Sequence, residues 1–180
     1  MKKVSIAALL AVFCLSTMNA QEVKFGVKAG VNFAQINAEF EGLGSGNSDS
    51  RTGFYIGGLA DIEISEKFHL QPELLFSSEG GDTIPYNYLN LPIIAKYYVV
   101  EGFNIQAGPQ FGYLLNVDGE GDLEGANRLT FGLDFGLGYD ISEKFFAEVR
   151  YDLGLSNLVD ESSINAKQNA IQLGIGYRFK

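Results

Sequence analysis

A strict two-residue alternation runs through residues 129–140, which read LTFGLDFGLGYD. Leu, Phe and Tyr occupy every odd position of this stretch, whereas Thr, Asp and Gly occupy every even one. Successive side chains of a β-strand point to opposite sides, so the pattern predicts a strand with one apolar face and one small or polar face. A helix, with its longer period, could not gather these apolar side chains on one side.

The same alternation recurs along the rest of the chain. It predicts eight strands, at 23–36, 52–64, 68–77, 87–99, 103–115, 129–140, 145–155 and 169–179. A tilted strand of about 10 residues spans the hydrocarbon core of a membrane. The sequence therefore predicts an all-β fold, an eight-stranded antiparallel up-and-down transmembrane β-barrel.

The connections between the predicted strands alternate in length. Three short ones centre on 65–67, 100–102 and 142–144, with apolar residues at matching spacing on both sides, as expected for three-residue hairpin loops. Four long ones, rich in Gly, Ser, Asn and acidic residues, cover 37–51, 78–86, 116–128 and 156–168. Short turns at one rim and long loops at the other are typical of outer-membrane barrels, whose short turns are periplasmic.

Glycines indicate which face of the strands points inward. The polar face carries Gly26, Gly30, Gly108, Gly112, Gly132, Gly136, Gly138, Gly174 and Gly176. The lumen of an eight-stranded barrel is crowded, which favours glycine there, whereas a solvated exterior has no such need. We therefore expect the polar face in the lumen and the apolar face against lipid. A soluble lipocalin-like carrier, with its apolar face inside, is the alternative.

The N-terminal segment predicts a cleaved signal peptide over residues 1–20, which leaves the barrel domain at 21–180. Two lysines precede a short apolar run, and Ala20 suits cleavage before Gln21. Two of the 13 basic residues and none of the 22 acidic residues lie in this leader, so the mature chain carries a net charge of −11. That charge argues against nucleic acid as a partner. Cys14, the single cysteine, also lies in the leader.

Charged side chains share the inward face with the glycines. The predicted structural network of the lumen comprises Lys28, Asp61, Glu63, Glu73, Lys96, Asp134, Glu148, Arg150, Asp152 and Arg178. Charges confined in a narrow lumen must pair or stay hydrated, because unpaired buried charge is costly. An ion-pair network that fills the barrel is the expectation, and a conduction path for ions is the alternative.

Few residues suggest chemistry beyond this network. His69 faces inward without an evident nucleophile, so we expect a hydrogen-bonding role and no catalytic site. Acidic residues alternate with other residues from Asp118 to Glu124, but the run lacks the distal glutamate of a calcium loop, which leaves only weak binding of divalent cations open. The sequence thus predicts neither a cofactor nor an established metal site.

Three motifs add a resemblance to a known family. The segments FGVKAGVNF at 25–33, YLNLPIIAKYY at 88–98 and GIGYRF at 174–179 resemble the PorT-like family of outer-membrane β-barrel proteins. The resemblance covers essentially all of 21–180. It implies an eight-stranded barrel in the outer membrane of a Gram-negative cell, and the namesake of the family takes part in a protein-secretion apparatus.

These observations together predict an integral protein of the bacterial outer membrane, monomeric and without enzymatic activity. Its expected role is structural or interaction-based in the cell envelope, with adhesion and assistance of protein secretion as candidate tasks. Expected partners are outer-membrane lipid and lipopolysaccharide, with an envelope or secretion-complex protein as a candidate. An outer-membrane lipid-modifying enzyme and a soluble lipocalin-like ligand carrier remain the alternatives.

Overall fold

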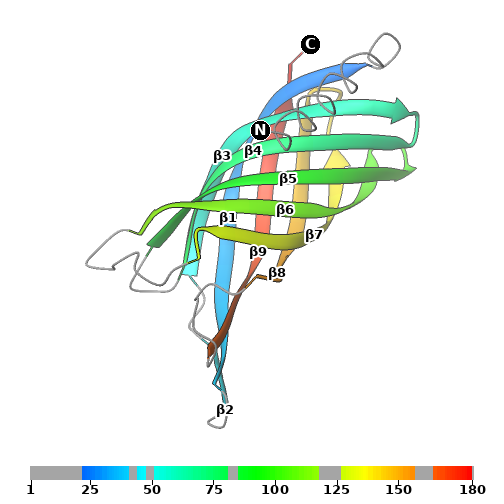
Figure 1. Cartoon of the computed structure of the whole chain (residues 1–180). Helices are drawn as coiled ribbons and strands as arrows, with labels where there is room; N and C mark the ends of the chain where they lie inside the picture. Colours follow the sequence, from blue (N-terminus) through cyan, green and yellow to red (C-terminus); the bar gives the residue numbers. More distant parts are fainter. Residues whose placement is uncertain are drawn as a thin grey trace, which may run out of the picture.

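A single antiparallel sheet, closed on itself, makes up the computed structural model (Figure 1). The structure describes residues 22–40, 44–47, 51–80, 85–117, 127–156 and 164–179. Its strands are β1 (Val23–Phe40), β2 (Gly44–Asn47), β3 (Arg51–Ser65), β4 (Phe68–Gly80), β5 (Pro85–Val100), β6 (Phe103–Val117), β7 (Leu129–Asp140), β8 (Phe145–Gly154) and β9 (Ile164–Arg178). The predicted signal peptide and the acidic run 118–124 lie outside the described residues. Within those residues, no helix is long and apolar enough to cross a membrane.

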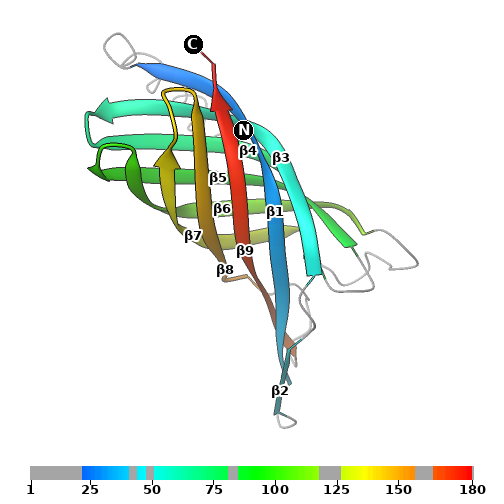
Figure 2. The ribbon, with the colours of Figure 1, turned by 180° about the vertical axis from the view of Figure 1, so that it is seen from behind.

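Eight of these strands form the barrel wall. Each pairs with its neighbour along the chain, and β1 pairs with β9 to close the ring, as the view from behind shows (Figure 2). β2 pairs only with the far end of β1, so it extends a hairpin without entering the ring. The predicted eight-stranded antiparallel up-and-down barrel is therefore confirmed.

The strands reach further into the long connections than the side-chain alternation predicts. β1 and β9 stay paired as far as Phe40 and Ile164, and β2 lies inside the segment 37–51 that was predicted to be loop. Those parts of the prediction were wrong. Alternation is imposed only where one face meets an apolar medium, whereas backbone N–H and C=O groups gain from pairing wherever strands run side by side.

The outward face of the wall is apolar, as the glycine argument predicts. Large hydrophobic side chains are exposed along every strand of the ring, and Phe25, Ile56, Leu74, Phe135, Tyr139 and Ile175 are examples more than 48% exposed. The buried set contains Lys, Arg, Asp, Glu, Asn and Gln side chains, which all lie on the inward face. Phe145, Tyr177 and Phe179 form a chain of ring contacts at the end with the short turns, where an interfacial girdle of aromatics belongs.

The short turns are tighter than expected at two places. Only Glu66 and Lys67 separate β3 from β4, and only Glu101 and Gly102 separate β5 from β6, in each case beside a register shift. Gly102 has a φ of +79°, the left-handed conformation that closes such a hairpin. Four residues, 141–144, join β7 to β8. Extra strand pairing thus shortens two of the predicted three-residue loops, and the bulged residue absorbs the difference.

The lumen also holds an apolar component that the sequence analysis did not single out. Tyr55, Leu59, Leu75, Tyr88, Ile94, Leu114 and Phe146 are buried on the inward face. Glycines on other strands make room for the largest of them: a Cβ at Gly174 would collide with the Tyr55 hydroxyl, and one at Gly176 with the Phe146 ring. The lumen is therefore crowded, as the glycine positions predict, and the Tyr55 and Phe146 side chains fill part of it.

Candidate functional site

The centre of the lumen is crossed by an ion pair between β8 and β4. Arg150 Nη1 donates to Glu73 Oε2 at 3.0 Å, and Arg150 Nη2 donates to Glu73 Oε1 at 2.6 Å. Two parallel bonds of this kind fix both the position and the orientation of the guanidinium. β4 and β8 are four places apart in the eight-strand ring in either direction, so this pair bridges opposite walls.

Lys28 and Glu148 complete this central layer. Lys28 Nζ donates to Glu73 Oε2 at 2.7 Å and also to Glu148 Oε1, while Arg150 Nη2 reaches Glu148 Oε2 at 2.9 Å. The ammonium of Lys28 lies 5.2 Å from the centre of the Tyr55 ring. Two cations and two carboxylates, all buried, thus neutralise one another in a closed cycle.

Amide side chains occupy the remaining hydrogen-bonding positions of the central layer. Gln106 accepts from Arg150 Nε at 2.7 Å, and Gln71 donates to Glu73 Oε1 at 2.6 Å. Buried charge is tolerated only when its hydrogen bonds are also satisfied, and these amides serve that need. The layer is therefore a built unit of six side chains from β1, β4, β6 and β8.

A second layer lies towards the short turns and is organised by Arg178. Its guanidinium donates to both oxygens of Asp140, at 3.0 and 2.7 Å, and its Nε lies 2.9 Å from Asp61 Oδ2. His69 Nδ1 lies 2.7 Å from Asp61 Oδ1, and the Tyr98 hydroxyl donates to Asp140 Oδ2 at 2.9 Å. The His69 and Tyr98 rings are in contact, with centroids 4.8 Å apart.

Lys96 lies between these two layers. Its Nζ is 3.9 Å from Asp61 Oδ2 and forms no hydrogen bond with the described residues. The Phe146 ring packs between two cations, with its centre 4.9 Å from Lys96 Nζ and 4.7 Å from Arg178 Cζ. Cation–π attraction in a desolvated site therefore substitutes in part for a missing anion.

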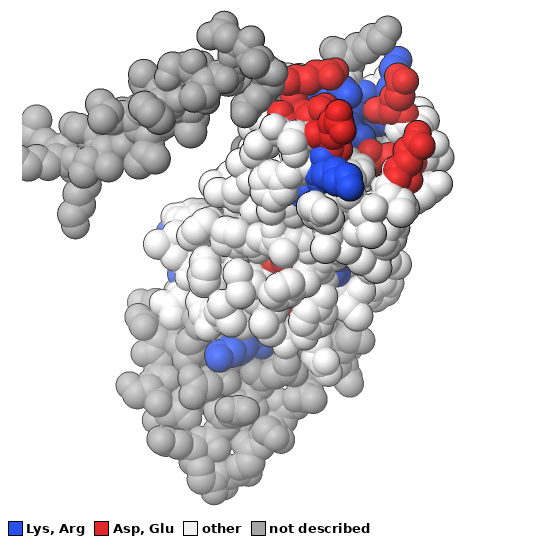
Figure 3. Space-filling model, turned by 90° about the vertical axis from the view of Figure 1, so that its right-hand side faces the viewer, with Lys and Arg blue, Asp and Glu red and all other residues white. Residues whose placement is uncertain are grey.

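The turn-side end of the lumen opens into a cavity of about 630 Å³. Asp61, His69, Tyr98, Asp140 and Arg178 are among its lining residues. Charged side chains gather at this end of the molecule, whereas the barrel wall below it carries few (Figure 3). Glu63, which was predicted to belong to the charge network, lines this cavity at the turn-side mouth of the lumen. Its side chain is partly exposed and has no partner among the described residues.

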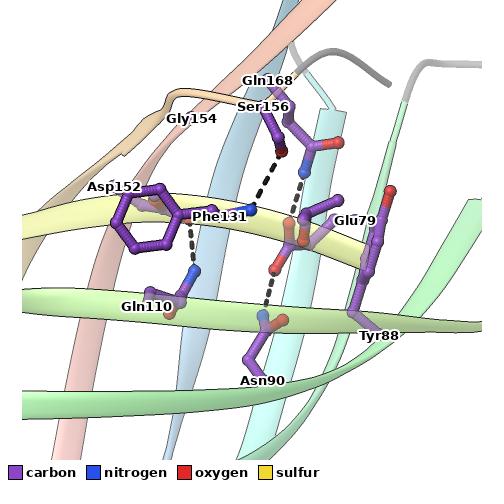
Figure 4. A pocket seen from close by; sticks show the side chains of 11 residues that line it. Glu79, Tyr88, Asn90, Gln110, Phe131, Asp152, Gly154, Ser156 and Gln168 are labelled. Atoms are coloured by element: carbon purple, nitrogen blue, oxygen red, sulfur yellow. Dashed lines mark hydrogen bonds between the residues drawn. The ribbon is translucent and has the colours of Figure 1, made fainter. Parts of the chain in front are cut away.

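A third layer lies towards the long loops and is centred on Glu79 of β4. Glu79 accepts hydrogen bonds from Asn90 at 3.2 Å and from Gln168 (Figure 4). It also accepts one from Ser77 at 2.5 Å. Gln110 donates to Asp152 Oδ2 at 2.6 Å. Glu79, Asn90, Gln110, Asp152 and Gln168 line a small cavity of about 30 Å³ at the loop end of the lumen. Asp134 faces Asp152 across the β7–β8 pair, and neither of its carboxylate oxygens has a partner in the described part of the chain.

Two features of these layers bear on the sequence-based expectations about catalysis and metal binding. The described hydrogen bonds link the His69 ring to Asp61 and to no serine or threonine. Nor do the described residues contain a group of three or more His, Cys, Asp or Glu side chains that could hold a metal ion.

The structure places the predicted network residues in different layers. Lys28, Glu73, Glu148 and Arg150 meet in the centre, and Asp61, Lys96 and Arg178 meet near the turns. Asp134 and Asp152 lie nearer the loops and form no ion pair with a basic side chain of the described residues, and Glu63 lies at the mouth. Glu79 is an inward-facing acid that was not predicted, because it falls in the predicted connection 78–86. Glu79 and Glu73 lie an even number of positions apart on β4, so their side chains point to the same side of the strand, into the lumen.

Comparisons with known proteins agree with this geometry. Two similar crystal structures are Ail, the attachment invasion locus protein of Yersinia pestis (17% identity, 88% of this chain and 99% of that chain, TM-score 0.53), and Neisserial surface protein A (15% identity, 88% and 99%, TM-score 0.54). At these identities the likeness establishes the fold alone. No curated protein matches the chain in sequence.

A family model for the outer membrane protein beta-barrel domain matches residues 19–160, which is more than half of the chain. The match, the closed ring and the apolar outer wall agree, and they locate the protein in the bacterial outer membrane. The chain therefore belongs to the outer membrane protein beta-barrel domain family.

Proposed function

We propose that this protein is a non-enzymatic, monomeric barrel with a structural or interaction role in the cell envelope. The bidentate pair between Arg150 and Glu73 is the observation that carries the proposal, because it closes the lumen from wall to wall. A closed lumen leaves no route for a solute. The barrel then serves as an anchor, and other molecules contact it through the short turns at one rim and the long connections at the other.

Adhesion and assistance of protein secretion are the two tasks that fit such an anchor. The resemblance of residues 88–98 to the PorT-like family favours a partner in a secretion complex, and the name of Ail refers to attachment and invasion by that protein. Lipopolysaccharide and lipid would surround the apolar wall in either case. An envelope protein would be met at the charged mouth near the short turns.

The closed lumen can be tested by conductance. We expect the purified protein in a planar bilayer to give no steady current, and the variant Arg150→Ala with Glu73→Ala to give measurable current. Glu63→Ala, which alters a charge at the mouth without touching the central layer, serves as the matched control. A steady current through the wild-type protein would contradict the anchor model and favour an ion path.

The interaction role can be tested by photocrosslinking in cells. A photoreactive residue at Glu101, in a short turn, or at Arg128, on the loop side, should yield an adduct with an envelope protein. The same residue at Phe135, in the lipid-facing wall, should not. Mass spectra of outer-membrane lipids from cells with and without the protein should be identical. A lipid product that depends on the protein would favour the alternative of a lipid-modifying enzyme.

A further inference from the structure

Unpaired acceptor atoms collect in the loop-side layer of the lumen. Within the described residues, the buried oxygens of that region without a hydrogen-bond partner are Asn32 Oδ1, Asp134 Oδ1, Asp134 Oδ2, Asp152 Oδ1, Gln110 Oε1 and Gln168 Oε1. The unpaired donors, such as Lys96 Nζ and Asn104 Nδ2, lie nearer the turns. Each unpaired buried oxygen is costly, so six in one layer point to a missing positive group.

The amide orientations in this layer are fixed by their neighbours. Gln110 Nε2 donates to Asp152, and Gln168 Nε2 donates to Glu79. A carboxylate can only accept, so the amide nitrogen must face it and the amide oxygen must point elsewhere. Gln110 is only 6% exposed and lines the small cavity, which leaves its oxygen turned into a space without a donor.

The charge balance of the lumen is also incomplete. Among the described residues, the buried charged side chains comprise four basic and six acidic groups: Lys28, Lys96, Arg150 and Arg178 against Asp61, Glu73, Glu79, Asp134, Glu148 and Asp152. The surplus is two negative charges. Lys28, Arg150 and Arg178 form close ion pairs in the central and turn-side layers, and Lys96 lies 3.9 Å from Asp61, so the surplus falls on the loop-side carboxylates.

We propose that the loop-side layer binds one divalent, oxygen-seeking cation of the calcium and magnesium class. Asp152 Oδ1 and Gln110 Oε1 supply ligands from the cavity wall, and Asp134 and Glu79 supply negative charge. Carboxylate and amide oxygens are the ligands that such cations prefer. The cavity of about 30 Å³ has room for one ion. No three His, Cys, Asp or Glu side chains of the described residues converge here, so amide oxygens, including Gln168 Oε1 in the cavity wall, must add to the ligand set.

Asp152→Asn is the variant that tests this site, since it removes one charge and keeps the shape. The full mature protein, folded in detergent micelles, is heated in a chelator and then in Ca²⁺, Mg²⁺ or K⁺. At a divalent concentration about 100-fold above the dissociation constant, the unfolding temperature of the wild type should rise by roughly 5–10 °C. K⁺ at the same ionic strength should leave it unchanged.

The unfolding temperature of Asp152→Asn should compare differently with that of the wild type in chelator and in Ca²⁺. In chelator it should be at least as stable as the wild type, because one repelling carboxylate is gone, and in Ca²⁺ it should gain little. A loop variant with Asp118→Asn and Asp122→Asn should keep the full gain, which separates the lumenal site from the acidic loop. The proposal fails if the wild type gains nothing from divalent ions or if Asp152→Asn gains as much. It also fails if only the loop variant loses the gain.

Discussion

Arg150 and Glu73, 77 residues apart in sequence, meet across the full width of the barrel through two hydrogen bonds. Their strands hold opposite places in the ring, so the pair ties together two walls that share no backbone hydrogen bond. Backbone pairing joins only neighbouring strands of the ring. The central layer thus adds a cross-link between opposite walls through the lumen.

Replacing Glu73 by Gln should destabilise the barrel strongly. The carboxylate is fully buried and accepts from both Arg150 and Lys28, so its loss leaves positive charge without compensation. Removal of one partner from a buried ion pair costs about 3–5 kcal/mol. Urea titration of folding in micelles would measure the change in free energy of unfolding.

Two further variants make this prediction specific. Glu63→Gln alters a carboxylate at the mouth that has no partner among the described residues, and it should change stability by less than about 0.5 kcal/mol. The double variant Glu73→Gln with Arg150→Met leaves Lys28 paired with Glu148, so it should recover most of the loss. Equal losses for Glu73→Gln and Glu63→Gln would show that the central layer contributes nothing special.

The alternation at 129–140 was sufficient to predict the barrel, because each strand must present an apolar face to lipid and a small or polar face to a crowded lumen. It could not predict β2 or the outer ends of β1 and β9. Beyond the apolar belt, both faces of a strand meet polar surroundings, so apolar and polar residues no longer alternate there even though the backbones still pair.

Parity likewise predicted which charges point inward but not how they pair. Asp134 and Arg150 both face the lumen, yet Arg150 donates to Glu73 and Glu148, and Asp134 receives no hydrogen bond from the described residues. Partner choice depends on the relative height of residues on non-adjacent strands. That height is set by the tilt and stagger of the closed ring, which no single strand encodes.

Gly176→Ala should be costly because of what occupies the lumen. A Cβ at Gly176 would collide with the buried ring of Phe146, which is itself held between Lys96 and Arg178. Overpacking of this kind costs about 1–3 kcal/mol in free energy of unfolding. Adding Phe146→Leu should restore part of it in the same urea titration.

Gly58→Ala provides the matched control for this prediction. A Cβ at Gly58 would meet only the Gly26 carbonyl oxygen, at 3.8 Å, on an exposed part of β3. The change should therefore stay within about 0.5 kcal/mol. Similar costs at both glycines would mean that the lumen is less crowded than the geometry indicates.

Gly102→Ala should weaken the hairpin between β5 and β6. The φ of +79° places Gly102 in the left-handed region, where a Cβ approaches the neighbouring carbonyl and costs about 1–2 kcal/mol. Gly102→Asn should cost less, since Asn tolerates this conformation better, and Glu101→Ala should be near neutral. If Ala and Asn at position 102 lower the urea midpoint equally, left-handed strain is not the cause.

Leu173→Arg tests the orientation of the wall on which the membrane assignment depends. Leu173 faces outward between Val31 and Val149, midway along the apolar belt, and Phe179 ends the same row near the turns. Arginine at the lipid midplane costs about 2–4 kcal/mol, and near the interface about 0–1 kcal/mol. Folding into liposomes at increasing urea should therefore show a much larger loss for Leu173→Arg than for Phe179→Arg. Equal, small losses would mean that water surrounds this face, and the apolar belt would then need another explanation.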